Sequence, residues 1–258
     1  MSRVALITGG AQGIGAGAAL KLLKEGFAGV VLLDLNESRL KQEATVLSKL
    51  GRVEMIAADL RDDATPAKAV AFCMEKFGRL DVLINAAGST QRGSVADVTL
   101  QNYHALFDVN VKAPLFLMQE AAKVMKGGTF INVASMIAHG GPPHLAAYSA
   151  SKAALVALTK HAAQEYAWAG IRSFCINLGW AFTEGEQAMQ TQFHGLPQDW
   201  SVAVSKQMPS GRLILPEDIA DLVAYLVSPS AQMMNGAVID FEQIPEGMFR
   251  VHPALKPA

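Results

Sequence analysis

The chain has 258 residues, of which 51% are hydrophobic and only 17% are charged, whereas about 25% of the residues in an average globular protein are charged. This composition excludes a disordered chain and favours an ample core or a subunit interface. The net charge of −1 argues against a nucleic-acid partner, and no apolar run approaches the ~20 residues of a membrane-spanning helix, so no membrane association is expected.

The two cysteines, Cys73 and Cys175, show no metal-ligand spacing. A disulfide scaffold and a cysteine-rich zinc site are therefore excluded, and the histidines show no metal spacing either, so we expect no metal. The N-terminus lacks the pattern of a signal peptide, and the expected setting is reduced and cytoplasmic.

Short aliphatic runs alternate with longer amphipathic segments along the chain. The aliphatic runs predict strands at 4–7, 30–33, 53–57, 82–84, 129–133, 173–176 and 238–239. The amphipathic segments predict helices at about 14–25, 37–50, 65–77, 100–126, 147–168 and 216–227. Strands that are aliphatic on both faces are typical of buried parallel sheets. Their alternation with helices predicts a doubly wound parallel sheet, the Rossmann-like three-layer α/β/α fold.

The domain organisation is predicted from the segments that lie outside the alternation of strands and helices. No linker rich in Pro, Gly or Ser divides the chain, so we predict a single domain over 1–258. The stretch at about 180–211 lacks a clear strand and is rich in Gln, Phe, Trp and Glu. It is interpreted as a partly helical lid over a substrate.

A glycine-rich turn joins the first predicted strand to the first predicted helix, and it contains Gly9, Gln12, Gly13, Ile14 and Gly15. Glycines allow the backbone to turn sharply and to approach a pyrophosphate, which the N–H groups of the helix N-terminus then bind. The spacing differs from the commoner dinucleotide pattern, and a tight turn without a ligand remains the alternative.

Asp34 ends the second predicted strand, about twenty residues after the glycine turn, where a carboxylate can bind the hydroxyls of an adenosine ribose. A carboxylate there would repel a 2′-phosphate. No basic residue directly follows Asp34, and Gln12 rather than a basic residue fills the turn, so the pattern favours NAD over NADP. A charge at a helix N-terminus is the alternative for Asp34 alone.

Tyr148 and Lys152 are four residues apart on a predicted helix and therefore share a face. An ammonium beside a phenol lowers the pKa of the phenol from about 10, which would make Tyr148 a usable general base. A chance pair on an amphipathic helix is the alternative. Ser135 and Asn85 follow two predicted strands, at the edge of the sheet where ligands bind in such folds.

Asn110 lies inside the predicted helix 100–126, four residues before Pro114. Proline has no N–H, so the carbonyl of Asn110 loses its normal helical partner. A kink there would leave the carbonyl able to hold a water. A bent helix without catalytic meaning is the alternative.

Taken in order, these residues resemble the motifs of the short-chain dehydrogenase/reductase family, over essentially the whole chain. The matching motifs are the Thr8–Gly15 turn, Asp59-Leu60, Asn85-Ala86-Ala87-Gly88, Asn110, Ser135, Tyr148 and Lys152. The family implies a Rossmann-like domain that binds NAD(P), usually as a tetramer. We therefore expect NAD as cofactor and a homotetramer, which the low charge content also favours.

The resemblance also implies catalytic roles. Tyr148 takes the proton of the substrate hydroxyl, and Ser135 orients that oxygen. Lys152 lowers the pKa of Tyr148 and binds the nicotinamide ribose, while Asn110 holds a water that links Lys152 to solvent. The hydride passes from the carbinol carbon to the nicotinamide, which is chemistry of the cofactor that the protein aligns.

Further cofactor contacts are implied by position in the family pattern. Asp59 and Leu60 flank the adenine. Asn85, Ala87 and Gly88 adjoin the ribose region.

The segment after the sixth strand contributes Gly179, Ala181 and Thr183, of which Thr183 matches the position that meets the nicotinamide carboxamide. Two departures stand out: Leu178 replaces a frequent proline, and Ile239-Asp240-Phe241-Glu242-Gln243 replaces a frequent Val-Asp-Gly-Gly.

The candidate substrate residues mix aromatic and hydrogen-bonding side chains, which suits a polyhydroxylated ligand, although loop side chains are also polar because they are solvated. They are Arg92, Ser135, His144, Tyr148, Trp180, Glu184 and His194. Arg92 could pair with the carboxylate of a sugar acid or be an ordinary solvated arginine. The run 178–186 also resembles sugar and polyol dehydrogenases within the family.

We therefore predict an NAD-dependent dehydrogenase that oxidises a small-molecule alcohol, namely a sugar, polyol or sugar acid. Two alternatives stay open. One is a carbonyl reductase for a steroid, acyl or xenobiotic ketone. The other is a non-catalytic dinucleotide sensor, against which the set Ser135, Tyr148 and Lys152 argues, because a sensor needs no general base.

Overall fold

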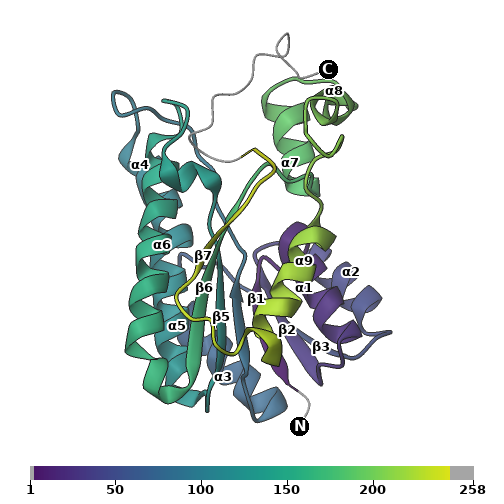
Figure 1. Ribbon diagram of the computed structural model, residues 1–258, viewed down its shortest axis with the longest axis vertical. Coiled ribbons are helices and arrows are strands. Elements are labelled where there is room, and N and C mark those ends of the chain that lie inside the picture. Colours follow the sequence, from purple (N-terminus) through teal and green to yellow (C-terminus); the bar gives the residue numbers. More distant parts are fainter. Residues whose placement is uncertain (1–2, 245–258) are drawn as a thin grey trace.

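The computed structural model describes residues 3–244 and contains one seven-stranded sheet in the order β3-β2-β1-β4-β5-β6-β7 (Figure 1). Every neighbouring pair of strands is parallel. The strands are β1 (Val4–Thr8), β2 (Gly29–Asp34), β3 (Arg52–Ala57), β4 (Val82–Asn85), β5 (Gly128–Val133), β6 (Ile171–Leu178) and β7 (Val238–Phe241). The predicted doubly wound parallel sheet is confirmed, with all seven strands at the predicted places.

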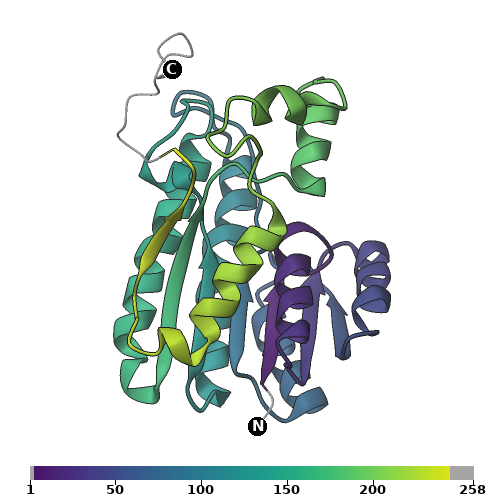
Figure 2. The ribbon, with the colours of Figure 1, turned by 45° about the vertical axis from the view of Figure 1, so that its right-hand side comes forward.

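Helices cover both faces of this sheet (Figures 1 and 2). The helices are α1 (Gly13–Lys24), α2 (Glu37–Leu47), α3 (Thr65–Phe77), α4 (Leu100–Phe107), α5 (Ala113–Val124), α6 (Ala146–Glu165), α7 (Glu184–Ala188), α8 (Trp200–Ser205) and α9 (Pro216–Val227). Helices α1, α2 and α9 pack on one face, and α3, α5 and α6 pack on the other. The arrangement is the predicted three-layer one.

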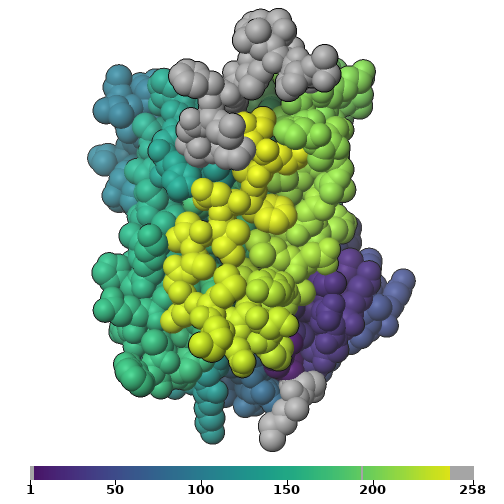
Figure 3. All heavy atoms as spheres, in the orientation of Figure 1, coloured from purple at the N-terminus to yellow at the C-terminus, as the bar shows by residue number. Residues whose placement is uncertain are grey.

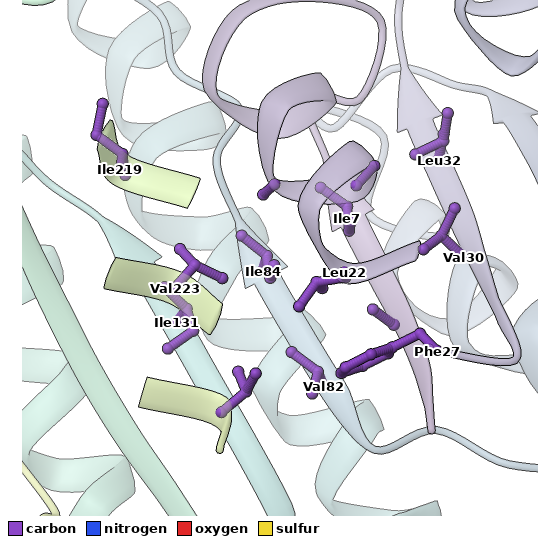
Figure 4. Close-up of a cluster of buried hydrophobic side chains, with 14 of the residues drawn as sticks. Ile7, Leu22, Phe27, Val30, Leu32, Val82, Ile84, Ile131, Ile219 and Val223 are labelled. Atoms are coloured by element: carbon purple, nitrogen blue, oxygen red, sulfur yellow. The ribbon is translucent and has the colours of Figure 1, made fainter. Parts of the chain in front are cut away.

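The core explains why the strands are aliphatic throughout. On the face of α1 and α9, Leu22 and Val223 pack with Ile7 and other strand residues in one buried cluster (Figure 4). The neighbouring strand residue Leu6 points to the opposite face, where it packs with Leu117 of α5. Successive side chains of a strand point to opposite faces, so a sheet that is covered on both sides needs apolar residues at every position.

The predicted helix 100–126 is three elements rather than one. Helix α4 is followed by a π-helix over Asp108–Lys112, and α5 starts at Ala113 with Pro114 in its first turn. Pro114 cannot donate the hydrogen bond that would continue a regular α-helix, and the widened turn lies directly before it. The predicted break at Asn110 is therefore a π-turn, a feature frequent at functional sites.

The segment 180–211 contains α7, a π-helix over Met189–Phe193 and α8. Figures 1 and 2 show α7 and α8 beyond the carboxyl ends of the strands, on the side of α9. The rings of Trp180 and Trp200 stack with centroids 5.6 Å apart, and Ala181 bridges Ile214 next to α9. The start of the segment is thus fastened to the residues before α9, and its two tryptophans pack on each other.

Strand β7 forms one edge of the sheet. In the space-filling view, the yellow segment that contains β7 lies at the surface of the molecule (Figure 3). Glu242, in the tail after β7, contacts the loop that follows β6. One of its carboxylate oxygens accepts a hydrogen bond from the backbone N–H of Trp180 at 3.3 Å. Within residues 3–244, no helix has the length and apolar character to cross a bilayer.

Candidate active site

The glycine turn is shaped by two glycines in the left-handed region, Gly9 at φ +69° and Gly13 at φ +57°. A Cβ on Gly9 would lie 2.9 Å from the Ala87 nitrogen, and one on Gly15 would lie 2.2 Å from the Gly9 oxygen. Only glycine fits at these contacts. The turn therefore brings the N-terminus of α1 close to the carboxyl end of β4 and forms a backbone cradle that fits a dinucleotide pyrophosphate.

Polar groups around the cradle also fit a dinucleotide. Asp34, the last residue of β2, accepts hydrogen bonds from the backbone of Ala11 at 3.2 Å and of Asn36 at 2.9 Å. The Oε1 of Gln12 is buried without a hydrogen-bond partner in the described part of the chain. The predicted neighbourhood of Asp34 and the glycine turn is present in the fold.

Ser135, Tyr148 and Lys152 come together from the end of β5 and the first turns of α6. The Lys152 Nζ lies 5.8 Å from the centre of the Tyr148 ring and donates a hydrogen bond to the Val133 carbonyl at 2.9 Å. The side chains of Ser135 and Thr90 lie close enough to the Tyr148 hydroxyl to lower its pKa. Thr90 belongs to the loop after β4, from which the sequence predicts pocket residues, and the fold brings it to Tyr148.

The protonation of Tyr148 differs from the expectation. Burial raises its pKa, hydrogen bonds with Ser135 and Thr90 oppose that rise, and the charge of Glu186 adds to it. The predicted lowering by Lys152 is therefore wrong for this structure. The physical reason is that burial of the Tyr148 hydroxyl penalises the phenolate, and that Lys152 is not among the groups that shift its pKa. Burial also lowers the pKa of Lys152, to about 8.

The side chain of Asn110 makes three hydrogen bonds. Its Oδ1 accepts a hydrogen bond from the Ser89 N–H at 2.8 Å, and its Nδ2 donates to the Ser89 carbonyl at 2.9 Å and to the Ser151 hydroxyl at 3.0 Å. The side chain thus fastens the loop after β4 to helix α6. A Cβ on Gly88 in that loop would lie 3.5 Å from the Lys152 Nζ, so the fastened loop borders Lys152.

The Asn85 side chain is hydrogen-bonded inside the protein and does not face a ligand. Its Nδ2 donates to the Asn132 Oδ1 at 2.8 Å, and Asn132 in turn donates to the Thr159 hydroxyl at 3.0 Å. This buried chain of hydrogen bonds links β4 and β5 to α6. The Ala87 N–H donates to the Thr8 hydroxyl at 3.1 Å and joins the ends of β4 and β1. Around the expected ribose region, backbone rather than the Asn85 amide is therefore exposed to a ligand.

The residues expected at the adenine are also engaged with the protein. Leu60 is buried in the core beneath α3. Asp59 forms an ion pair with Arg61 at 2.6 Å, and the Arg61 guanidinium lowers the pKa of Asp59. Asp59 keeps a partly exposed carboxylate at the end of β3, whereas the side chain of Leu60 is not available to flank a base.

The residues after β6 lie next to the cradle. The Thr183 hydroxyl accepts a hydrogen bond from the Glu186 N–H at 3.1 Å and caps α7. A Cβ on Gly13 would lie 3.4 Å from the Thr183 side chain, so Thr183 borders the glycine turn. At Gly179 a Cβ would lie 2.2 Å from a carboxylate oxygen of Glu242. The tail therefore shapes the loop that lacks the frequent proline.

The expected substrate residues divide into two groups. Arg92 and His194 meet, with the Arg92 Nη2 2.9 Å from the His194 Nε2, and connect the loop after β4 to the segment 180–211. The Trp180 Nε1 donates to the Glu186 carboxylate at 2.7 Å, which adds Glu186 to the surroundings of Tyr148.

The other two point elsewhere. The side chain of His144 is exposed, and its carbonyl accepts a hydrogen bond from the Gly93 N–H at 2.9 Å. Glu184 contacts the glycine turn, where its carboxylate accepts from the Gly13 N–H at 3.2 Å. Glu184 therefore lies on the cofactor side of the site rather than beside Tyr148. No group of three or more His, Cys, Asp or Glu within residues 3–244 is arranged to hold a metal.

Comparisons with known proteins agree with this geometry. Residues 9–242 match a family model described as Enoyl-(Acyl carrier protein) reductase. The chain is 34% identical to galactitol 2-dehydrogenase of Agrobacterium fabrum, over 88% of this chain and 91% of that protein. It is 30% identical to 2-dehydro-3-deoxy-D-gluconate 5-dehydrogenase of Dickeya dadantii, over 92% of each.

Solved structures of a dehydrogenase and a ketoreductase superpose on this chain over almost its whole length. An NAD⁺-bound xylitol dehydrogenase superposes with a TM-score of 0.84 at 25% identity, over 94% of this chain and 98% of that one. Actinorhodin polyketide ketoreductase with NADPH superposes with a TM-score of 0.87 at 26% identity, over 94% and 96%. With this fold, the glycine cradle and the set Ser135, Tyr148 and Lys152 in place, the chain belongs to the short-chain dehydrogenase/reductase family, whose enzymes bind a nicotinamide dinucleotide and act on CH–OH groups.

Proposed function

We propose that this enzyme oxidises a hydroxyl group of a sugar, polyol or sugar acid and uses NAD as the acceptor. The observation that carries the proposal is the polar and aromatic surroundings of the catalytic tyrosine. Thr90 and the charge of Glu186 both act on the pKa of the Tyr148 phenol, and Trp180 holds Glu186. Such groups suit a ligand with several hydroxyls better than an apolar one. Relatives named as galactitol and xylitol dehydrogenases support the same substrate class.

Each catalytic residue has a role that its contacts support. Tyr148 takes the proton of the substrate hydroxyl, and Ser135, whose side chain lies near the Tyr148 hydroxyl, orients the same oxygen. Lys152, with a pKa lowered to about 8 by burial, exchanges a proton near neutral pH. Asn110 fixes the loop beside Lys152, and its carbonyl, which Pro114 cannot bond, holds a water. The oxidised nicotinamide supplies the hydride acceptor and a positive charge when bound.

The choice of NAD rests on Asp34. Its carboxylate lies at the end of β2 and contacts the glycine turn through the Ala11 N–H at 3.2 Å, where the ribose hydroxyls of NAD would find an acceptor and a 2′-phosphate would meet a like charge. The segment 180–211 is the lid of this single-domain enzyme. Arg92 and His194 connect that lid to the loop after β4.

A homotetramer is part of the proposal. Apolar side chains lie exposed on α4 and α5, among them Leu100, Tyr103, Leu115 and Phe116. Large apolar side chains that lie exposed in one subunit can be buried in an interface between subunits.

The test is a measurement of NADH formation by absorbance with galactitol, xylitol, sugar acids and apolar secondary alcohols, with NAD and NADP in parallel. We expect turnover with a sugar-type alcohol and NAD. Tyr148→Phe should still bind NADH but lose activity by ~10²–10⁴-fold. Faster turnover with NADP would refute the argument from Asp34. Near-normal activity of Tyr148→Phe would remove this residue from the mechanism.

A second candidate function is reduction of an acyl or other apolar ketone. It is favoured by the similarity to a polyketide ketoreductase. Turnover of apolar substrates alone would select it over the sugar-type substrate. Binding of NADH without any turnover by the wild-type enzyme would favour the dinucleotide sensor.

A further inference from the structure

Glu184 places a carboxylate in the cradle. Its Oε2 accepts a hydrogen bond from the Gly13 N–H at 3.2 Å, and Gly13 is the first residue of the twelve-residue helix α1. The N–H groups at a helix N-terminus bind anions because they lack intrahelical partners and lie at the positive end of the helix dipole. Glu184 thus occupies a position that suits any anion, including a phosphate.

The contact belongs to a wider packing of α7 on the glycine turn. A Cβ on Gly13 would lie 3.4 Å from the Thr183 side chain, and a Cβ on Gly185 would lie 3.4 Å from the Gln12 Nε2. The residues on both sides of Glu184 therefore touch the turn. Gln12, within this contact, retains a buried Oε1 with no hydrogen-bond partner in the described range. The polar groups of the turn are thus only partly satisfied by α7.

The pyrophosphate of a dinucleotide binds to this same end of the first helix in Rossmann-type folds. A carboxylate and a pyrophosphate repel each other and cannot both accept the Gly13 N–H. We propose that Glu184 competes with the cofactor pyrophosphate for the N-terminus of α1, so that dinucleotide binding requires the start of α7 to move off the glycine turn. Glu184 then sets the cofactor affinity and couples cofactor entry to the position of the segment 180–211.

The chain offers a matched control in Glu43 on α2. The pKa of Glu43 is raised by its burial and by the negative charge of Glu184, which shows that the two carboxylates share a neighbourhood. Glu43 has no hydrogen bond to the glycine turn within residues 3–244. Glu43→Gln therefore removes a nearby charge without removing the competing contact.

The experiment measures NADH and NADPH affinity by fluorescence titration for the wild type, Glu184→Gln, Glu184→Ala and Glu43→Gln. Affinities for ADP and adenosine follow from displacement of NADH. Because a carboxylate at a helix N-terminus contributes up to ~1 kcal/mol, both Glu184 variants should bind NADH and ADP roughly 3- to 5-fold more tightly. Adenosine, which has no phosphate, should bind unchanged, and Glu43→Gln should resemble the wild type.

Three results would overturn the inference. The first is unchanged or weaker NADH binding in both Glu184 variants. The second is an equal gain for adenosine, which would mean that α7 restricts the whole site rather than the pyrophosphate. The third is an equal gain in Glu43→Gln, which would reduce the effect to general charge. None of these readouts depends on the alcohol that the enzyme oxidises.

Discussion

The buried ammonium of Lys152 has a measurable cost for the fold. Burial lowers its pKa from 10.5 to about 8, and one pKa unit corresponds to ~1.4 kcal/mol, so holding the charged form at neutral pH costs about 3 kcal/mol of folding free energy. Lys152→Met keeps the length of the side chain and removes the charge. It also removes the hydrogen bond to the Val133 carbonyl at 2.9 Å, worth about 1 kcal/mol. The net expectation is a gain of about 2 kcal/mol at pH 7 together with loss of activity.

The pH dependence gives a second, independent readout. The native protein releases the Lys152 proton near pH 8, whereas the unfolded chain keeps it up to the model-compound pKa of 10.5. Between these values the unfolded chain binds more protons, so wild-type stability rises with pH relative to the variant. The advantage of Lys152→Met should therefore shrink by about 2 kcal/mol between pH 7 and pH 9.5. Comparing the two proteins at each pH cancels the titrations of groups that do not interact with Lys152. Cys175 is not one of these groups, because the Lys152 charge lowers the pKa of its thiol.

The assay is urea unfolding followed by circular dichroism at both pH values. Lys160→Met is the control, because Lys160 lies on the same helix but is exposed, and its stability should change by less than ~0.5 kcal/mol. A Lys152→Met variant no more stable than the wild type at pH 7, or a stability difference independent of pH, would refute the reasoning.

Three further substitutions test the geometry of the site and the interface. Gly15→Ala should destabilise the protein by more than ~2 kcal/mol and abolish NADH binding, since its Cβ would lie 2.2 Å from the Gly9 oxygen; an unchanged melting temperature would contradict this. Asn110→Ala should cost about 2–3 kcal/mol in urea unfolding, because the Ser89 backbone groups lose their partners; a change below ~0.5 kcal/mol would show that water replaces the amide. Phe116→Glu, on the exposed face of α5, should give particles near 27.4 kDa in sedimentation velocity, and an intact tetramer would place the interface elsewhere.

The arrangement of strands and helices could be predicted because it depends on local pattern. Continuous aliphatic runs such as Val30–Leu33 specify buried parallel strands, and Gly170, at φ +72°, marks the end of the helical region predicted as 147–168. The single helix predicted over 100–126 is in fact three elements. The sequence shows Pro114, but it does not show whether this proline ends, bends or widens the helix. A proline can end, bend or widen a helix, and the packing around Asn110 decides between these outcomes.

The proximity of Tyr148 and Lys152 could be predicted in the same way, because they are neighbours on one helix. Contacts between distant loops could not. Thr90 reaches Tyr148 from another strand end, and Glu184 lies 171 residues from Gly13 in the chain. The pKa of Tyr148 was mispredicted for a related reason: spacing shows which charges are near, whereas burial, which dominates here, depends on the whole fold.

Lys152 and Glu184 carry opposite charges, and each affects both the stability of the protein and the proposed site. A lysine ammonium 4% exposed, with a backbone carbonyl as its hydrogen-bond acceptor, destabilises the fold in proportion to its lowered pKa. A carboxylate on the α1 N-terminus stabilises the protein while it excludes the cofactor pyrophosphate. Lys152 is therefore not placed where stability alone would put it, and local violations of this kind are characteristic of functional sites. A Lys152 variant that gains stability and loses activity would show that the site gives up folding stability for turnover. Glu184 variants that gain cofactor affinity would show that the site also gives up cofactor affinity for the contact between α7 and the glycine turn.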